Sequence, residues 1–189
     1  MKLVLASLSP RRRELLSRLP YPFEVHSLPT EEFSDGELPA GELPLRNAEN
    51  KARAVAERFP DAVVVGADTV ILFDRRIIGK PRDAEDAFRT LKELSGRTHE
   101  VVTGIALLRQ CDGFRRVWSE KTSVTFKPLD DAAIEKYMRL VDVLDQAGSY
   151  ALQEHGDLIV SQLSGDPDNV VGLPLGRLAA ELEKLRREE

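Results

Sequence analysis

Residues 63–72 (VVVGADTVIL) constrain the fold more than any other part of the chain, because one carboxylate interrupts an apolar run. Short runs rich in β-branched residues are typical of strands buried on both faces. An ionised carboxylate in such a strand costs several kcal/mol unless a cation, a metal or donor groups lie beside it. Asp68 is therefore either a structural acid that caps a neighbouring turn or a functional acid. Gly66 has no side chain and would let backbone or ligand approach just before that acid.

The composition indicates a single ordinary globular domain. The 189 residues are 42% hydrophobic and 31% charged, and they are enough to bury a sizeable core. We expect a cytoplasmic protein without membrane contact, because the sequence has no membrane-length apolar run and no signal-peptide pattern. The single cysteine, Cys111, excludes an internal disulfide and a cysteine-based metal cluster. With a net charge of -5, the surface as a whole is not suited to nucleic acid, so an anion site requires a local concentration of basic residues.

Such a concentration follows the first predicted strand, residues 2–7. Ser9 and Pro10 predict a helix start, because serine is a good N-cap and proline fits the first helical position. Three consecutive arginines, Arg11 to Arg13, then occupy the first turn, where cations oppose the helix dipole. An anion bound by free backbone N–H groups and arginine side chains would remove this conflict. The alternative is three solvated arginines on an exposed face.

Two lysines are further candidates for binding phosphate. Lys51 lies at the edge of the apolar stripe of a predicted helix over residues 44–59, where lysine commonly extends to solvent. The alternative is that it points into a site. Lys80, between Gly79 and Pro81, lies on a tight turn and is either solvated or a phosphate ligand. The Gly-x-x-x-x-Gly-Lys-Ser/Thr motif is absent, which disfavours Walker-type hydrolysis.

Acidic residues and one histidine complete the candidates. Residues 30–42 form an acidic, glycine- and proline-containing segment that should be a surface loop or lid. Glu31 and Glu32 begin it, as a solvated pair or as metal ligands that face the Asp68 strand. His99 begins another strand, and we interpret it as a hydrogen-bonded structural residue in preference to a catalytic base.

The order of the remaining elements predicts an α/β fold with a mixed, twisted sheet flanked by helices. Asp83 should cap one helix, Gly96 should end it, and Asp130 or Asp131 should cap the next. Asp112-Gly113 should close a long hairpin. Near the C-terminus we expect a strand over residues 158–163, a polar turn over 165–169 and a final helix.

The chemistry that these residues favour is the attack of water on a phosphoanhydride. A Gly-x-Ser-x-Gly motif and a His-Glu-x-x-His motif are both absent, which disfavours serine and zinc hydrolysis. Cations would neutralise the polyphosphate, a carboxylate would orient or deprotonate the water, and a divalent ion would bridge oxygens. Mg²⁺ or Mn²⁺ suits an all-oxygen site better than zinc.

The motifs also follow one another in the order of a known family. They are LAS-x-SPRR-x-ELL from Leu5, Lys51-Ala52, GADTV from Gly66, GKP-x-D from Gly79, LSG-x-x-H-x-V-x-T from Leu94, AG-x-Y-x-x-Q from Ala147 and VGLPL from Val171. This pattern resembles the Maf family of nucleotide pyrophosphatases over nearly the whole chain. The main unmatched stretch is the loop after Glu32.

The resemblance implies one domain over residues 1–189 with the mixed-sheet fold of inosine-triphosphate pyrophosphatases, and it allows two lobes around a central cleft. It implies a cytoplasmic, commonly homodimeric and metal-dependent hydrolase that converts nucleoside triphosphates into monophosphate and pyrophosphate. Asp68 matches the family's proton acceptor. The residues that match specificity positions, with the identities of the dTTP/UTP type, are Arg11, Thr69 and Gln153. The residues that match phosphate ligands are Ser7, Arg12, Lys51 and Lys80. Glu32 matches a candidate metal ligand, and Asp68 handles the water, the metal or both.

Several positions depart from the family pattern. Gln146 replaces a common lysine, Glu154 replaces a common glycine, and Asp166-Pro167 replaces part of a common turn, which leaves affinity and base choice open. Two alternatives also stay open at this point. One is a nucleotide-binding regulator of septum formation that acts through protein contacts. The other is a nucleic-acid binder built on the arginine cluster, which the acidic total and sparse aromatic residues disfavour.

Overall fold

The computed structural model describes residues 1–34 and 36–188, which cluster into two compact units. The first unit contains Met1–Thr69, Val102–Glu120 and the C-terminal segment from Asp168. The second unit contains Val70–Val101 and Lys121–Pro167. Three long strands contribute residues to both units. The cleft between two lobes that the resemblance allows stays a prediction.

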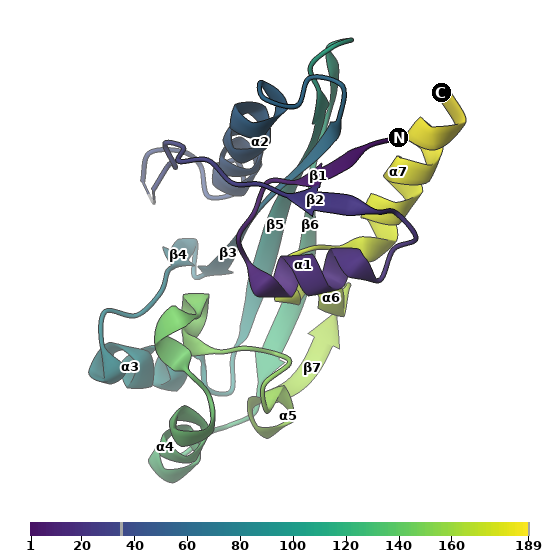
Figure 1. Ribbon diagram of the computed structural model, residues 1–189. Coiled ribbons are helices and arrows are strands. Elements are labelled where there is room, and N and C mark those ends of the chain that lie inside the picture. Colours follow the sequence, from purple (N-terminus) through teal and green to yellow (C-terminus); the bar gives the residue numbers. More distant parts are fainter. Residues whose placement is uncertain (35, 189) are drawn as a thin grey trace. The chain divides into compact units, whose positions relative to one another are not determined.

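The strands form a mixed sheet with the order β2-β1-β3-β5-β6-β7, and β4 pairs with β3 (Figure 1). Their bounds are β1 Leu3–Leu5, β2 Phe23–Val25, β3 Val63–Phe73, β4 Arg76–Ile78, β5 Thr98–Arg109, β6 Phe114–Phe126 and β7 Val160–Ser164. β1 is parallel to β2 and to β3, whereas β4 is antiparallel to β3 and β7 is antiparallel to β6. The predicted mixed sheet is therefore confirmed.

The α-helices are α1 Pro10–Ser17, α2 Leu43–Ala56, α3 Ala84–Leu94, α4 Asp131–Leu140, α5 Gly156–Ile159, α6 Pro167–Val171 and α7 Leu175–Glu188. Two short 3₁₀ helices, η1 Val143–Asp145 and η2 Ala147–Ser149, follow α4. The predicted caps are confirmed, because Asp83 and Asp130 accept N–H groups from the first turns of α3 and α4. Gly96 follows α3 with a φ of 68°, as the predicted helix end requires.

The first unit buries both faces of its sheet, which explains why β1 and β3 read as continuous apolar runs. Leu3 and Leu5 pack with leucines of α1 and α7, whereas Val4 packs with the alanines of α2. Successive side chains of a strand point to opposite faces, so three adjacent apolar residues serve two separate clusters. The prediction that the strand around Asp68 is buried on both faces is therefore confirmed for Val63 to Val65, all 0% exposed.

Gly66 brings the backbone of α2 against β3. A Cβ atom at this position would lie 2.2 Å from the carbonyl oxygen of Ala48 and 2.9 Å from the Cβ of Ala52. These separations are far below van der Waals contact, so the close approach depends on the absence of a side chain. The expectation that backbone lies close just before Asp68 is thus confirmed, and the neighbour is a helix.

In the second unit, His99 is a buried structural residue. It is 2% exposed, its Nε2 lies 2.8 Å from the Tyr150 hydroxyl, and its ring packs edge-on against Phe126 with centroids 5.1 Å apart. Burial lowers the pKa of His99 to about 4. The hydrogen-bonded structural role is confirmed.

This lowered pKa predicts a stability that depends on pH. Unfolded His99 binds a proton near its ordinary pKa of about 6.5, whereas folded His99 resists protonation until about pH 4. The free energy of unfolding should therefore fall as the pH drops between these values, by up to about 3 kcal/mol. Urea unfolding at about pH 7 and about pH 4.5 measures the loss. His99→Gln should reduce it, whereas His155→Asn, on an exposed histidine, should not. Equal losses in all three proteins would contradict this origin.

Near the C-terminus two predictions were wrong in detail. Residues 158–163 were expected as one strand, but α5 extends to Ile159 and β7 begins at Val160. Residues 165–169 were expected as a polar turn, but α6 begins at Pro167, because proline fits a first helical turn. Among the described residues, no helix has both the length and the apolarity that a membrane span requires.

Candidate active site

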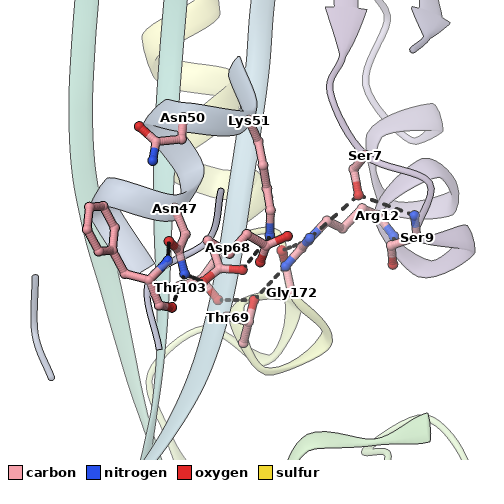
Figure 2. Close-up of polar contacts among 12 residues, drawn as sticks. Ser7, Ser9, Arg12, Asn47, Asn50, Lys51, Asp68, Thr69, Thr103 and Gly172 are labelled. Atoms are coloured by element: carbon pink, nitrogen blue, oxygen red, sulfur yellow. Dashed lines mark hydrogen bonds and ion pairs between the residues drawn. The ribbon is translucent and has the colours of Figure 1, made fainter. Parts of the chain in front are cut away.

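The loop between β1 and α1 gathers polar groups at the start of that helix (Figure 2). The Ser9 side chain accepts the backbone N–H of Arg12 at 3.4 Å, which confirms the predicted cap. Ser7 is 7% exposed, and its Oγ accepts the backbone N–H of Ser9 at 3.2 Å. Because this oxygen acts as an acceptor, the Ser7 hydroxyl proton is available to donate to a ligand.

Arg12 extends from this helix start across to β3 and to the segment after α6. Its Nε donates to the carbonyl oxygen of Gly172 at 3.0 Å, and its two terminal nitrogens donate to Thr69 Oγ1 at 3.1 Å and Ser7 Oγ at 3.5 Å (Figure 2). Gly172 has a φ of 119°, and a Cβ there would lie 3.4 Å from Arg12 Nε. A guanidinium group has five N–H donors, so two of them remain for a ligand.

All three of these acceptors are neutral, so the charge of Arg12 is not balanced by a direct partner. Across the described part of the chain, no carboxylate lies within ion-pair distance of this guanidinium. Burial lowers the pKa of Arg12, the Asp68 carboxylate opposes that shift, and Arg11 adds to it by repulsion. A partly buried guanidinium with neutral partners and unused donors is well suited to bind an anion.

Lys51 of α2 points inward and bridges two carboxylates. Its Nζ lies 2.7 Å from Asp68 Oδ1 and 2.8 Å from Glu32 Oε2, and its side chain is 18% exposed. The alternative of a lysine extended to solvent is therefore wrong. The ammonium group also explains how β3 tolerates a carboxylate that is only 13% exposed.

Asn47, one helical turn before Lys51, connects the same carboxylate to the predicted loop. Its amide nitrogen donates to Asp68 Oδ2 at 3.2 Å and to the carbonyl oxygen of Phe33 at 3.1 Å. Its Oδ1 accepts the backbone N–H of Phe33 at 2.7 Å, and Asn50 Nδ2 donates to the carbonyl oxygen of Glu31 at 3.3 Å. Two asparagines of α2 thus hold the segment that carries Glu32. Asp68 is not a turn cap, because its oxygens face Lys51 and Asn47.

A cavity of about 340 Å³ opens beside these groups. Its polar lining includes Ser7, Ser9, Arg12, Glu32 and Lys51. This volume lies within the range of small-molecule sites, and the lining supplies both cations and hydroxyl donors. The predicted phosphate ligands of the first unit therefore share one cavity.

Glu32 and Asp68 also fit a hard divalent cation. Their oxygens converge on a single positive group, the Lys51 ammonium, at 2.8 and 2.7 Å. Magnesium sites commonly use one or two carboxylates together with substrate phosphates. No cluster of three or more His, Cys, Asp or Glu side chains suitable for a metal occurs among the described residues. Within residues 1–34 and 36–188, the candidate metal donors at this site are the carboxylates of Glu32 and Asp68.

The other predicted site residues, Arg11, Lys80 and Gln153, make no hydrogen bond or ion pair with these groups in the part of the chain that the structure describes. Arg11 is half-buried, and within residues 1–34 and 36–188 its side chain makes no hydrogen bond or ion pair. Lys80 and Gln153 are exposed and belong to the second unit, where Lys80 Nζ lies 2.5 Å from Asp145 Oδ1. For Lys80, the structure thus records an ion pair with a surface carboxylate.

Comparison with known proteins identifies the family. The model of the family described as Maf-like protein matches residues 2–185. The chain belongs to the Maf family. A dTTP/UTP pyrophosphatase of Akkermansia muciniphila is 48% identical over 91% of this chain and 90% of its own length. A dTTP/UTP pyrophosphatase of Ruminiclostridium cellulolyticum is 43% identical over 98% of this chain and 97% of its own length.

The fold of this Maf protein also has a solved counterpart. The structure of the Staphylococcus aureus Ham1 protein matches with a TM-score of 0.55 at 15% identity, and the match covers 97% of this chain and 99% of that one. At this identity the likeness concerns the fold alone. Together with the family match, it confirms the predicted α/β class with a mixed sheet between helices.

Sequence reasoning assigned no role to three residues of this Maf site. Asn47 was missed, although its position four residues before Lys51 places both side chains on one helical face. Thr103 and Gly172 were noted only as parts of motifs, yet both take part in the contacts around Thr69 and Arg12. The signal for Asn47 was an amide at the edge of an otherwise apolar stripe.

Proposed function

We propose that the protein hydrolyses nucleoside triphosphates, dTTP and UTP among them, to nucleoside monophosphate and pyrophosphate. One observation carries the proposal: a cavity contains Arg12, whose hydrogen-bond acceptors among the described residues are all neutral, together with Lys51, which pairs with the largely buried Asp68 carboxylate of β3. The names of the curated relatives, dTTP/UTP pyrophosphatase, support the same reaction and substrates. The hydrolysis would remove unwanted nucleoside triphosphates from the nucleotide pool, modified pyrimidine nucleotides among them.

Substrate binding would use the cations and donors of the first unit. The two unused N–H groups of Arg12, the Ser7 hydroxyl and the backbone N–H groups at the start of α1 would hold phosphate oxygens. Lys51 would add a second positive charge. These groups would stabilise the negative charge that develops when the phosphoanhydride bond breaks. Arg11, Thr69, Lys80 and Gln153 stay proposed substrate or specificity residues.

Asp68 would act on the attacking water. An oxygen of its carboxylate accepts a proton from water, the water oxygen bonds to phosphorus, and the bond to the pyrophosphate group breaks. Lys51 and Asn47 hold the two oxygens of this carboxylate in fixed directions. The hydrolysis consumes one water and needs no other reactant.

A divalent cation, Mg²⁺ or Mn²⁺, is the proposed cofactor, held by Glu32 and Asp68. When bound, it would neutralise phosphate oxygens and act as a Lewis acid. The donor set of carboxylate oxygens favours these hard ions over zinc. Asn47 and Asn50 would keep Glu32 close to Asp68 by fixing the backbone on either side of it. Cytoplasmic location and a homodimer stay predictions from the family resemblance.

A panel of normal and modified nucleoside triphosphates, assayed for pyrophosphate release with Mg²⁺ or Mn²⁺, tests the proposal. We expect release of equal amounts of monophosphate and pyrophosphate, with dTTP and UTP among the best substrates. Release of inorganic phosphate alone would contradict the bond assignment. Nucleotide binding without any pyrophosphate release would favour the regulator of septum formation, which the names of the cited relatives do not support.

A further inference from the structure

Thr69 lies in a chain of hydrogen bonds whose direction is fixed by chemistry. Figure 2 shows the contact between Thr69 Oγ1 and Thr103 Oγ1, which lie 3.0 Å apart. Thr103 Oγ1 also lies 3.1 Å from the carbonyl oxygen of Asn169. A carbonyl oxygen can only accept, so the single hydroxyl proton of Thr103 must point to Asn169. Thr103 must then accept from Thr69.

The proton of Thr69 is therefore directed into the protein. Arg12 donates to the same Thr69 oxygen at 3.1 Å, so the chain runs from the guanidinium through both threonines to the Asn169 carbonyl. Thr103 is 0% exposed, and its hydroxyl has no alternative position at the surface. Thr69 is thus committed as an acceptor for Arg12 and has no proton left to donate to a ligand.

We propose that Thr103 is a positioning residue that fixes the guanidinium of Arg12 through Thr69. A hydroxyl group that donates one hydrogen bond becomes a stronger acceptor for another. The bond from Thr103 to the Asn169 carbonyl therefore strengthens the bond from Thr69 to Thr103, which in turn strengthens the bond from Arg12 to Thr69. Nε is held separately by the Gly172 carbonyl at 3.0 Å, so two anchors set the plane of the guanidinium. Its unused donors then point in one direction. This inference rests on the proposed function, because it assigns the fixed guanidinium to phosphate.

Thr103→Val tests the proposal, because valine keeps the shape and loses the hydroxyl. We expect the KM for dTTP and for UTP to rise about tenfold, by the same factor for each, while kcat changes by less than about threefold. Inhibition by inorganic pyrophosphate should weaken by a similar factor. Thr103→Ser restores the hydroxyl and should return both quantities to within about twofold of wild type.

Thr122→Val is the matched control. Thr122 is also 0% exposed, and its Oγ1 donates to the carbonyl oxygen of Asp166 at 2.9 Å in the second unit. This variant also loses a hydrogen bond from a threonine hydroxyl to a backbone carbonyl, and it should leave the KM and the pyrophosphate inhibition unchanged. Thermal unfolding of all variants separates a loss of stability from a loss of positioning.

Three outcomes would overturn the proposal: an unchanged KM in Thr103→Val, a failure of Thr103→Ser to restore it, or a change in the dTTP-to-UTP preference. Should Thr103→Val not fold, Thr103→Cys, whose thiol is a weak donor, must show the same rise. Calorimetric measurement of inorganic pyrophosphate binding tests the positioning role of Thr103 separately from the proposed hydrolysis. A wild-type protein that binds pyrophosphate but hydrolyses no nucleotide refutes the proposed function, and Thr103→Val still decides the positioning role.

Discussion

Asp68→Asn is expected to reduce pyrophosphate release from dTTP and UTP by on the order of 10³-fold or more while the fold is retained. Asparagine has nearly the same shape, so the contacts of β3 should survive. The amide cannot accept a proton from water, however, and it leaves the Lys51 ammonium with Glu32 as its remaining carboxylate partner. Pyrophosphate release at saturating Mg²⁺ or Mn²⁺ measures the effect, and circular dichroism checks the fold.

Asp61→Asn provides the control for this variant. Asp61 is exposed and lies just before the same strand, so the substitution makes an identical change of charge outside the cavity. Its turnover should equal that of the wild type. Undiminished turnover in Asp68→Asn would remove Asp68 from the chemistry, and equal losses in both variants would point to a general effect of charge.

Arg12→Met should separate activity from stability. The loss of one or two charge-assisted hydrogen bonds to phosphate should lower kcat/KM by on the order of 10²-fold. The free energy of unfolding should change by less than about 1 kcal/mol, because two effects oppose each other. Methionine relieves the burial of a charge whose hydrogen-bond acceptors among the described residues are all neutral, but it removes the donor that Arg12 supplies to Thr69 and to the Gly172 carbonyl. Steady-state kinetics and urea unfolding measure the two quantities.

Arg13→Met is the matched control, because the adjacent arginine is exposed and lies on the same helix turn. It should lose little activity, since its guanidinium makes no contact with Thr69 or Gly172. Arg12→Lys should remain impaired, because a single ammonium cannot bond three separate acceptors and a phosphate together. Full activity in Arg12→Lys would show that charge alone suffices and that the fixed geometry is dispensable.

The sequence predicted those parts of the site where a charged residue is energetically unfavourable in its local segment. Consecutive arginines at a helix start and a carboxylate in an apolar strand are each unfavourable alone, and they pointed to Arg12, which lines the cavity, and to Asp68, which pairs with Lys51 of its lining. Helix caps such as Ser9 and Asp83 were predictable because they depend on neighbours within a few residues. The orientation of Lys51 was left open, because helical periodicity places it at an edge and cannot say which way it turns.

Contacts between distant segments were not predictable in the same way. The bond between Thr103 and the Asn169 carbonyl joins residues 66 positions apart, and Asn47 contacts Phe33 across a loop. Such pairs depend on strand register and loop path, which no single segment encodes. The start of β7 at Val160 is a similar case, since a short apolar run fits the last turn of a helix as well as a strand.

Gly66 makes the arrangement of Lys51, Asn47 and Asp68 sensitive to a substitution outside the cavity. This residue sets the separation between α2, which carries Lys51 and Asn47, and β3, which carries Asp68. Any side chain there would force the helix axis outward from the strand, because the obstructing atoms at 2.2 and 2.9 Å include backbone that cannot rotate aside. Both the Lys51 ammonium and the Asn47 amide would then lie too far from the Asp68 carboxylate to bind it. The short distance between α2 and β3 therefore decides which residues position 66 can accept.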